Sequence, residues 1–263
     1  MYKGYLFDLD GTMYQGSQII ESAVIFVNWL AEQGIPYLFV TNNSTKTAQQ
    51  VADKLVAIGC QQVGPEHIVT SSDVAATTIA RDFADAPVFM IGENGLMRAL
   101  EAAGITLTTS ELEAEVVVVG LDTDVTYEKL AKATLAIRRG ATFIATNPDT
   151  NIPSERGLLP GAGALVQLLI TATQVQPLVM GKPEPAIILA AIERLGLTRE
   201  VVVMVGDNYH TDIMAGIHAD IATLWVDTGI HRHEYILAQD IQPTHTIADL
   251  AQWQQQLEAQ AGK

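Results

Sequence analysis

Near its N-terminus the chain reads Tyr5-Leu-Phe-Asp8-Leu-Asp10-Gly-Thr12, an apolar run that ends in two carboxylates and a glycine turn. Apolar runs of this kind are typical of parallel strands buried on both faces. Ligands of open α/β sheets bind outside the carboxyl ends of such strands. The fold does not need two crowded carboxylates there, whereas Mg²⁺ prefers oxygen ligands of this type. The alternative for the pair alone is a helix cap or a solvated turn.

Three more polar sites follow apolar runs further along the chain. Residues 35–40 lead into Thr41, residues 177–180 lead into Lys182, and residues 201–205 lead into Asp207. We expect these runs and the first one to form four strands of one parallel sheet, so that their ends meet at one edge. Carboxylates, a hydroxyl and an ammonium gathered there are the groups that phosphoryl transfer requires.

In this order the motifs resemble those of the haloacid dehalogenase (HAD) superfamily of phosphatases. They read Asp8-Leu-Asp10-Gly-Thr12, Thr41-Asn42, Lys182, and Gly206-Asp207 with Asp212. Within the superfamily the chain is similar to the NagD-like branch. That similarity rests on Thr41-Asn42-Asn43-Ser44, Ala145-Thr-Asn-Pro-Asp149, Pro160-Gly-Ala-Gly-Ala164 and Gly181-Lys-Pro183. The resemblance implies a doubly wound, Rossmann-like parallel-sheet core and an inserted α/β cap that closes over the site.

Asp8 and Asp10 are the predicted catalytic residues. Asp8 is the nucleophile that forms an aspartyl-phosphate, with a pure metal ligand as the alternative. Asp10 is the general acid that protonates the leaving group and the base that activates water. The predicted ligands of Mg²⁺ are Asp8, Asp10 and Asp207, and the resemblance implies that Asp10 binds through its backbone carbonyl.

A larger set of residues is predicted to bind the phosphate or the substrate: Asp10, Thr41, Asn42, Asn43, Lys182, Asn208, Tyr209, His210 and Thr211. Asn43 has a credible alternative role as a helix N-cap. Asp212 either supports the metal site from behind its direct ligands or is a favourable anion in the first turn of a helix. His231 and His233 could bind a metal, but their spacing in a polar stretch is more typical of solvent-facing side chains.

Strand and helix patterns alternate along the whole chain, which indicates an α/β protein. The interval between Thr41 and Lys182 is too long for one crossover and has its own βα rhythm. Residues 1–79 and 178–263 are therefore predicted to form the catalytic core, and residues 80–177 the cap. Ser71 or Ser72 is expected to cap the helix after residue 69. Substrate choice is assigned to Asn147, Asp149, Asn151 and Arg156, with an ordinary Asx-rich turn as the alternative.

Composition limits the classes of function. The chain has 263 residues, 48% of them hydrophobic, which is enough for two domains with real cores. Its net charge of −15 disfavours nucleic-acid binding, and no segment predicts membrane association. Its one cysteine, Cys60, has no internal disulfide partner. We expect a cytoplasmic protein that acts on a small phosphorylated metabolite. The sequence is compatible with a homodimer.

The sequence thus predicts an Mg²⁺-dependent phosphatase for a small phosphomonoester, of the nucleotide monophosphate or sugar phosphate class. One alternative is a phosphotransferase or mutase that uses the same intermediate and excludes water. The other is a non-enzymatic, receiver-like signalling module. A receiver has the size of one small domain and carries its phosphorylated aspartate on a later strand than its acidic pair, so this alternative fits the chain less well.

Overall fold

The computed structural model describes residues 2–261 and divides the chain into two compact units. The core unit comprises the chain up to Thr41, Gln49–Val69 and the residues from Lys182 on. The inserted unit comprises Asn42–Ala48 and Thr70–Gly181. The predicted division at residues 79/80 and 177/178 stays a prediction. No helix among residues 2–261 is long and apolar enough to cross a membrane.

The core unit is built on a six-stranded sheet in the order β14-β13-β12-β1-β4-β5. The strand pairings from β14 to β4 are all parallel. The central strand β1 is buried along its whole length because its four residues, Gly4–Phe7, have neighbours on both sides and on both faces. Its strands are β1 (Gly4–Phe7), β4 (Tyr37–Thr41), β5 (Ile68–Thr70), β12 (Val202–Gly206), β13 (Ala222–Val226) and β14 (His245–Ile247).

Register places the ends of three core strands side by side. Phe7 pairs with Val205 on one side and with Phe39 on the other. Asp8 continues the ladder, since its backbone N–H donates to the Val205 carbonyl at 2.9 Å. Asp8, Asp207 and Thr41 therefore all leave the sheet at its carboxyl edge, as the sequence predicts.

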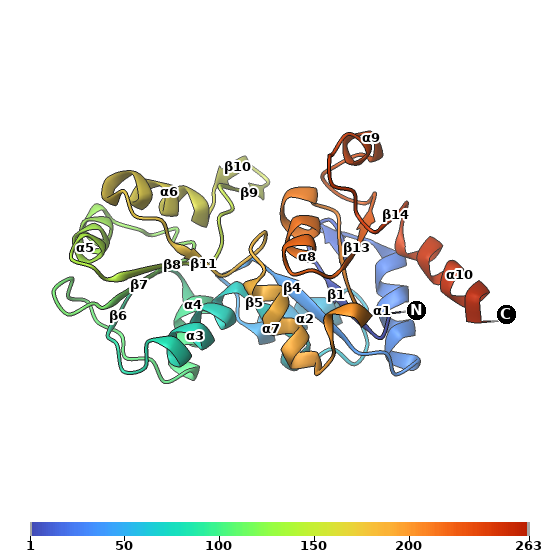
Figure 1. Cartoon of the computed structure of the whole chain (residues 1–263), viewed down its shortest axis with the longest axis horizontal. Helices are drawn as coiled ribbons and strands as arrows, with labels where there is room; N and C mark the ends of the chain where they lie inside the picture. The colour runs from blue at the N-terminus through green and yellow to red at the C-terminus, as the bar shows by residue number, and fades with distance from the viewer. Residues whose placement is uncertain (1, 262–263) are drawn as a thin grey trace. The chain divides into compact units, whose positions relative to one another are not determined.

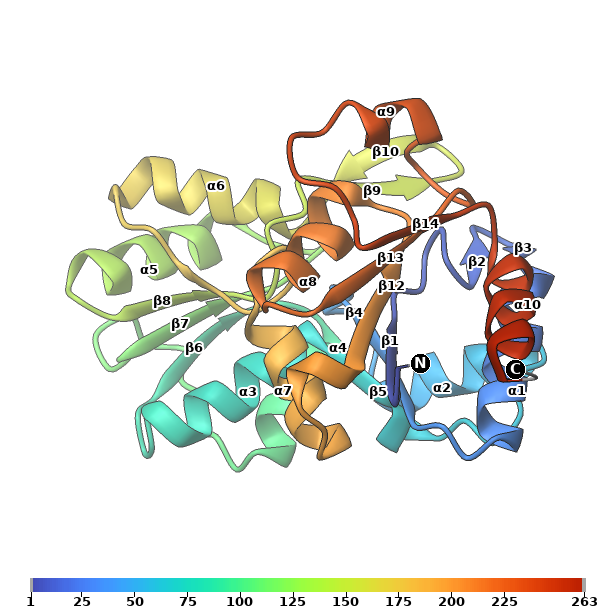
Figure 2. The ribbon, with the colours of Figure 1, turned by 45° about the vertical axis from the view of Figure 1, so that its right-hand side comes forward.

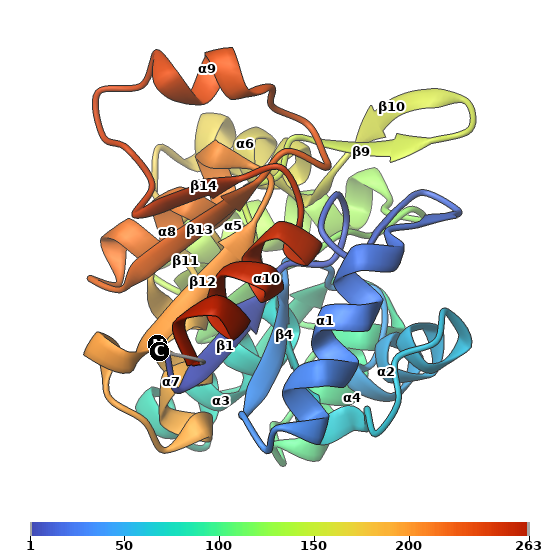
Figure 3. The same ribbon diagram turned by 90° about the vertical axis from the view of Figure 1, so that its right-hand side faces the viewer.

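Helices cover both faces of this sheet. Helices α1 and α10 pack against each other in front of β1 and β4 (Figure 3), and α7 packs on β1 and β4. Phe26 of α1 meets Tyr5 and Phe7 edge to face, an arrangement that aromatic rings prefer. The remaining elements of the unit are β2 (Tyr14–Gln15), β3 (Gln18–Ile19), α1 (Glu21–Glu32), α2 (Ala48–Ala57), η1 (Pro65–His67), α7 (Ala186–Leu195), η2 (Arg199–Val201), the π-helix η3 (Tyr209–Ile213), α8 (Met214–His218), α9 (His233–Leu237) and α10 (Leu250–Ala261).

The inserted unit has its own four-stranded parallel sheet in the order β11-β8-β7-β6. Helices α5 and α6 lie on one face of this sheet and α3 and α4 on the other (Figure 1, Figure 2). An antiparallel hairpin, β9–β10, which the sequence analysis did not predict, precedes α6. The elements are α3 (Ser71–Asp82), β6 (Val88–Ile91), α4 (Asn94–Ala102), β7 (Val116–Val119), α5 (Tyr127–Arg138), β8 (Thr142–Ala145), β9 (Asn151–Ser154), β10 (Gly157–Pro160), α6 (Ala162–Thr173) and β11 (Leu178–Val179).

Two sequence-based expectations about these elements are wrong. The strand before Lys182 does not belong to the catalytic sheet: Leu178 and Val179 pair with Ile144 and Ala145 of β8, in the sheet of the inserted unit. This strand has only two residues, neither fully buried, so it lacks the burial on both faces that its apolar letters suggested. The cap of α3 is Thr70 and not one of the serines, because Thr70 forms a reciprocal capping box with Asp73.

Candidate active site

Lys182 lies at the centre of the carboxyl edge of the core sheet and is almost fully buried, with 2% of its side chain exposed. Its ammonium contacts Asp8 at 2.5 Å and Asp212 at 2.8 Å, and it donates to the Val40 carbonyl at 3.0 Å. A buried ammonium is stable only when its charge and its donors are matched in this way. Although β11 belongs to the other sheet, the sequence prediction that Lys182 joins Asp8 is confirmed.

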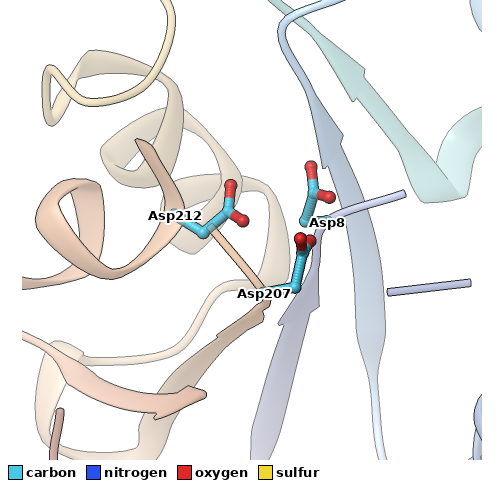
Figure 4. A group of neighbouring side chains, drawn as sticks. All are labelled: Asp8, Asp207 and Asp212. Atoms are coloured by element: carbon cyan, nitrogen blue, oxygen red, sulfur yellow. The ribbon is translucent and has the colours of Figure 1, made fainter. Parts of the chain in front are cut away.

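Three carboxylates surround this ammonium. Asp8, Asp207 and Asp212 each offer an oxygen, and these oxygens all lie within 4.8 Å of one another. Figure 4 shows the three side chains close together. Asp8 directly follows β1, Asp207 directly follows β12, and Asp212 belongs to the π-helical turn Tyr209–Ile213. One ammonium cannot neutralise three carboxylates, so the cluster has the charge and the oxygen ligands that suit a divalent cation. The third carboxylate is Asp212, which the sequence analysis left as one of two alternatives, and binding of the cation by the Asp10 backbone carbonyl stays a prediction.

Crowding of the carboxylates changes their proton affinities. Burial, helped by Asp212 and Asp207 and opposed by Lys182, raises the pKa of Asp8 well above its usual value. Burial and the nearby charge of Asp212 raise the pKa of Asp207 to about 7. Burial disfavours the Lys182 ammonium, but the charges of Asp212 and Asp8 outweigh this effect and raise its pKa above the usual value. A bound cation would relieve the repulsion that these shifts record.

Asp207 is oriented by its neighbours. The Thr12 hydroxyl is 3.4 Å from Oδ1, and the Ile230 backbone N–H donates to Oδ2 at 2.8 Å. Two glycines leave room for the carboxylate: a Cβ on Gly11 would lie 2.4 Å from it, and one on Gly229 would lie 1.8 Å from Oδ2. Gly11 also has a φ of +92°, a conformation that other residues rarely adopt. Close backbone approach therefore shapes this side of the site.

Asp212 is held by the π-helical turn Tyr209–Ile213. Its carboxylate accepts from the Asn208 backbone N–H at 3.0 Å and from the Thr211 hydroxyl at 3.1 Å. Asn208 and Thr211 thus orient Asp212 in this structure. Tyr209 is buried and its hydroxyl donates to the Ile241 carbonyl at 2.7 Å, so its predicted role in binding substrate stays a prediction. His210 is exposed and bonds to Tyr235.

Asp10 lies beside the carboxylate cluster without joining it. Its backbone pairs with Tyr14, at the start of the short β2–β3 hairpin. Partial burial raises the pKa of Asp10. The charge of Lys54 and a hydrogen bond with the Gly16 backbone act in the opposite direction and lower it. A carboxyl with a raised pKa that remains open to solvent has the properties of a general acid.

The residues that follow β4 divide between the units. Thr41 ends β4 in the core unit and is buried. The Asn42 side chain donates to the Asp149 carboxylate at 3.1 and 3.3 Å, within the inserted unit. The Asn43 side chain accepts from the backbone N–H groups of Thr45 and Lys46. This pattern supports the alternative role of Asn43, capping a turn, over phosphate binding.

The residues predicted to choose the substrate have different surroundings. Asn147 is buried and donates to the Asn42 carbonyl at 2.7 Å, while its Oδ1 accepts from the Asp149 backbone N–H at 3.1 Å. These bonds form an Asx-type turn, as the alternative proposed. Asn151 and Arg156 are exposed on the β9–β10 hairpin. Their role in specificity stays a prediction.

Sequence reasoning missed the loop after β13. Thr228 donates to the Gly11 carbonyl at 2.6 Å, and Gly229 and Ile230 contact Asp207. The motif Asp227-Thr-Gly229 after a buried strand was an available signal, but a backbone donor such as the Ile230 amide has no signature in sequence. His231, expected to face solvent, is half-buried and accepts from the Tyr209 backbone N–H at 3.2 Å.

Comparisons with known proteins show which family and which proteins this chain resembles. Residues 5–106 match the family of haloacid dehalogenase-like hydrolases, and residues 179–253 match a HAD-hydrolase-like family. The chain is 50% identical to 5'-nucleotidase YutF of Bacillus subtilis over 252 residues, covering 96% of this chain and 97% of that protein. It is 49% identical to the acid sugar phosphatase of Staphylococcus aureus (strain USA300), covering 95% of each chain.

Solved structures show the same similarity. A thermostable NPPase double mutant from Geobacillus stearothermophilus matches with a TM-score of 0.90 and 48% identity, covering 96% of this chain and 98% of that one. The p-nitrophenyl phosphatase from Archaeoglobus fulgidus matches with a TM-score of 0.91 and 34% identity, covering 97% and 99%.

An α/β fold whose carboxyl edge gathers one lysine and three aspartates defines a class of phosphoryl-transfer enzymes. The chain belongs to the haloacid dehalogenase-like hydrolases, in their NagD-like branch. It is a phosphatase, a hydrolase of phosphoric monoesters.

Proposed function

We propose that this protein hydrolyses a small phosphomonoester in an Mg²⁺-dependent reaction that passes through an aspartyl-phosphate on Asp8. The observation that carries the proposal is the arrangement of Lys182, whose ammonium bridges Asp8 and Asp212 inside a cluster of three carboxylates. This arrangement supplies a nucleophile, a fixed cation and a set of metal ligands within one small volume.

In the first step an Asp8 oxygen attacks phosphorus and the ester oxygen leaves. Lys182 stabilises the negative charge that accumulates on the phosphoryl oxygens, and its charge opposes the rise in the pKa of Asp8 that burial causes. Asp10 donates its proton to the leaving oxygen, in keeping with its raised pKa. The result is the free alcohol and an acyl phosphate on Asp8.

In the second step water attacks the phosphorus of the acyl phosphate. Asp10, now ionised, takes a proton from that water. The bond between the Asp8 oxygen and phosphorus breaks, and phosphate leaves with the Asp8 carboxylate regenerated. Thr41, at the end of β4, is the proposed hydroxyl donor to the phosphate.

Asp8, Asp207 and Asp212 would hold the divalent cation. When bound, Mg²⁺ supplies positive charge against the phosphoryl oxygens and lowers the repulsion between nucleophile and substrate. The fit rests on the chemistry of the donor set, which is all oxygen, and on the unbalanced negative charge of the cluster.

Nucleotide monophosphates and sugar phosphates are the proposed substrate class, supported by the names of the related 5'-nucleotidase and acid sugar phosphatase. A panel of phosphorylated metabolites, assayed for released phosphate with Mg²⁺ and with EDTA, tests this assignment. The intermediate is tested by quenching turnover in acid and searching for a phosphorylated peptide that contains Asp8. The same peptide from an Asp8→Asn variant is the matched control and should carry no phosphate.

The phosphotransferase or mutase alternative differs only in the acceptor. Release of one equivalent of inorganic phosphate for each ester consumed supports hydrolysis, whereas a phosphorylated organic product without free phosphate would favour the alternative. A receiver-like module fits less well, because the acidic pair, which includes the proposed nucleophile Asp8, directly follows a single strand, β1.

A further inference from the structure

The segment that follows β13, residues 227–235, consists of a loop and the first residues of α9, and it contacts Asp207 through its backbone; we name it the strap. The Ile230 backbone N–H donates to Asp207 Oδ2 at 2.8 Å, and Gly229 lies so close that a Cβ there would overlap the same oxygen. The Thr228 hydroxyl donates to the Gly11 carbonyl at 2.6 Å, beside the turn after β1. The orientation of Asp207 thus depends on where the strap lies.

Little of the strap is anchored by burial. Residues Asp227–Gly229 and His231 are half-buried, and Ile230 is 68% exposed. Segments with few buried apolar contacts open most easily. Ile236, directly after the strap, is fully buried against Tyr209 and Trp225, and a further interaction helps to keep the Ile230 amide at Asp207.

That interaction is a stack of two rings at the far end of the strap. The Tyr235 and His231 rings lie 4.4 Å apart with an angle of 13° between their planes. His231 Nδ1 accepts from the Tyr209 backbone N–H at 3.2 Å, and the Tyr235 hydroxyl bonds to His210 Nε2 at 2.5 Å. Tyr209 and His210 belong to the same π-helical turn that carries Asp212.

The stack therefore joins the strap, which orients Asp207, to the turn that orients Asp212. We propose that Tyr235 and His231 are positioning residues for the divalent-cation site, acting through the Ile230 amide on Asp207. This inference rests on the proposed metal site. It adds two residues that lie outside the sequence motifs.

The test is titration of Mg²⁺ alone into the metal-free full-length protein by calorimetry. An aromatic pair of this kind contributes roughly 0.5–1.5 kcal/mol, which corresponds to a Kd for Mg²⁺ raised about 2- to 10-fold in Tyr235→Ala. Tyr235→Phe keeps the stack and should bind Mg²⁺ within about 2-fold of the wild type, because water replaces the exposed hydroxyl bond. Leu237→Ala, an exposed position just past the strap, is the matched control and should bind unchanged.

A second arm separates positioning from general loss of structure. In Tyr235→Ala the Mg²⁺ concentration for half-maximal turnover should rise by the same factor as Kd, while kcat at saturating Mg²⁺ stays near the wild-type value. The double variant Tyr235→Ala/His231→Ala should bind no more weakly than His231→Ala, because the two rings act through one contact.

An unchanged Kd in a folded Tyr235→Ala variant would overturn the inference and leave the proposed function standing. So would an equal loss in Tyr235→Ala and Leu237→Ala. Failure of the wild-type protein to bind Mg²⁺ would overturn the proposed metal site and this inference together.

Discussion

The metal-free protein should lose stability through Asp207 as the pH rises. The pKa of Asp207 is raised from the usual 3.8 to about 7, mainly by burial and then by Asp212. A raised carboxyl pKa means that the folded state binds the proton more tightly than the unfolded chain. The stabilisation from protonated Asp207 is therefore present below pH 3.8 and is lost as the pH rises to about 7.

The size of this effect follows from the shift. A difference of about 3 pKa units, at 1.36 kcal/mol for each, is roughly 4 kcal/mol between pH 4 and pH 8. In Asp207→Asn the side chain cannot titrate, but its remaining oxygen can still accept from Ile230. The difference in unfolding free energy, wild type minus variant, should fall by about 4 kcal/mol over this range.

Urea unfolding in EDTA, at half-unit steps of pH for both proteins, measures this difference directly. Taking the difference removes the contribution of other groups whose titration the variant shares. Excess Mg²⁺ should flatten the curve above pH 7, because the cation replaces the proton as the partner of the cluster. A difference that is constant with pH, or that increases, would refute the assignment of a raised pKa to Asp207.

Four further predictions concern the reaction and its substrates. Asp8→Asn should abolish turnover with an unchanged circular dichroism spectrum; near-wild-type kcat would rule out the nucleophile. Asp10→Asn should lose about 10²–10⁴-fold with alkyl phosphates and less with p-nitrophenyl phosphate, whose leaving group needs little protonation, and an equal loss with both esters would argue against the acid role. EDTA should stop turnover, and Ca²⁺ should restore little of it because its larger and looser shell competes for the nucleophile's oxygen; full activity without metal would contradict this. Arg156→Ala should change the ranking of substrates, whereas Asn147→Ala, at a buried turn, should lower the melting temperature as well; equal kinetics for all substrates in both variants would place specificity elsewhere.

Much of the fold could be read from local sequence because buried parallel strands are continuous apolar runs. The strands Val88–Ile91, Val116–Val119, Thr142–Ala145 and Ala222–Val226 each coincide with a run of apolar residues and threonine. β11 is the exception, because the residue types of a two-residue strand do not determine which sheet it joins. Only pairing with β8 shows that it belongs to the inserted unit.

The sequence also predicted which chemical groups gather at the site. Asp8, Lys182 and Asp207 each follow a strand, and the carboxyl ends of parallel strands lie at one edge of a sheet. The sequence could not show that Asp212 completes the carboxylate cluster, because the position of Asp212 depends on a π-helical turn. Nor could it show that Tyr209 points into the core, or that the Ile230 amide orients Asp207. Side-chain type is written in the sequence, but the direction of a side chain and the placement of a backbone N–H are set only when distant segments pack together.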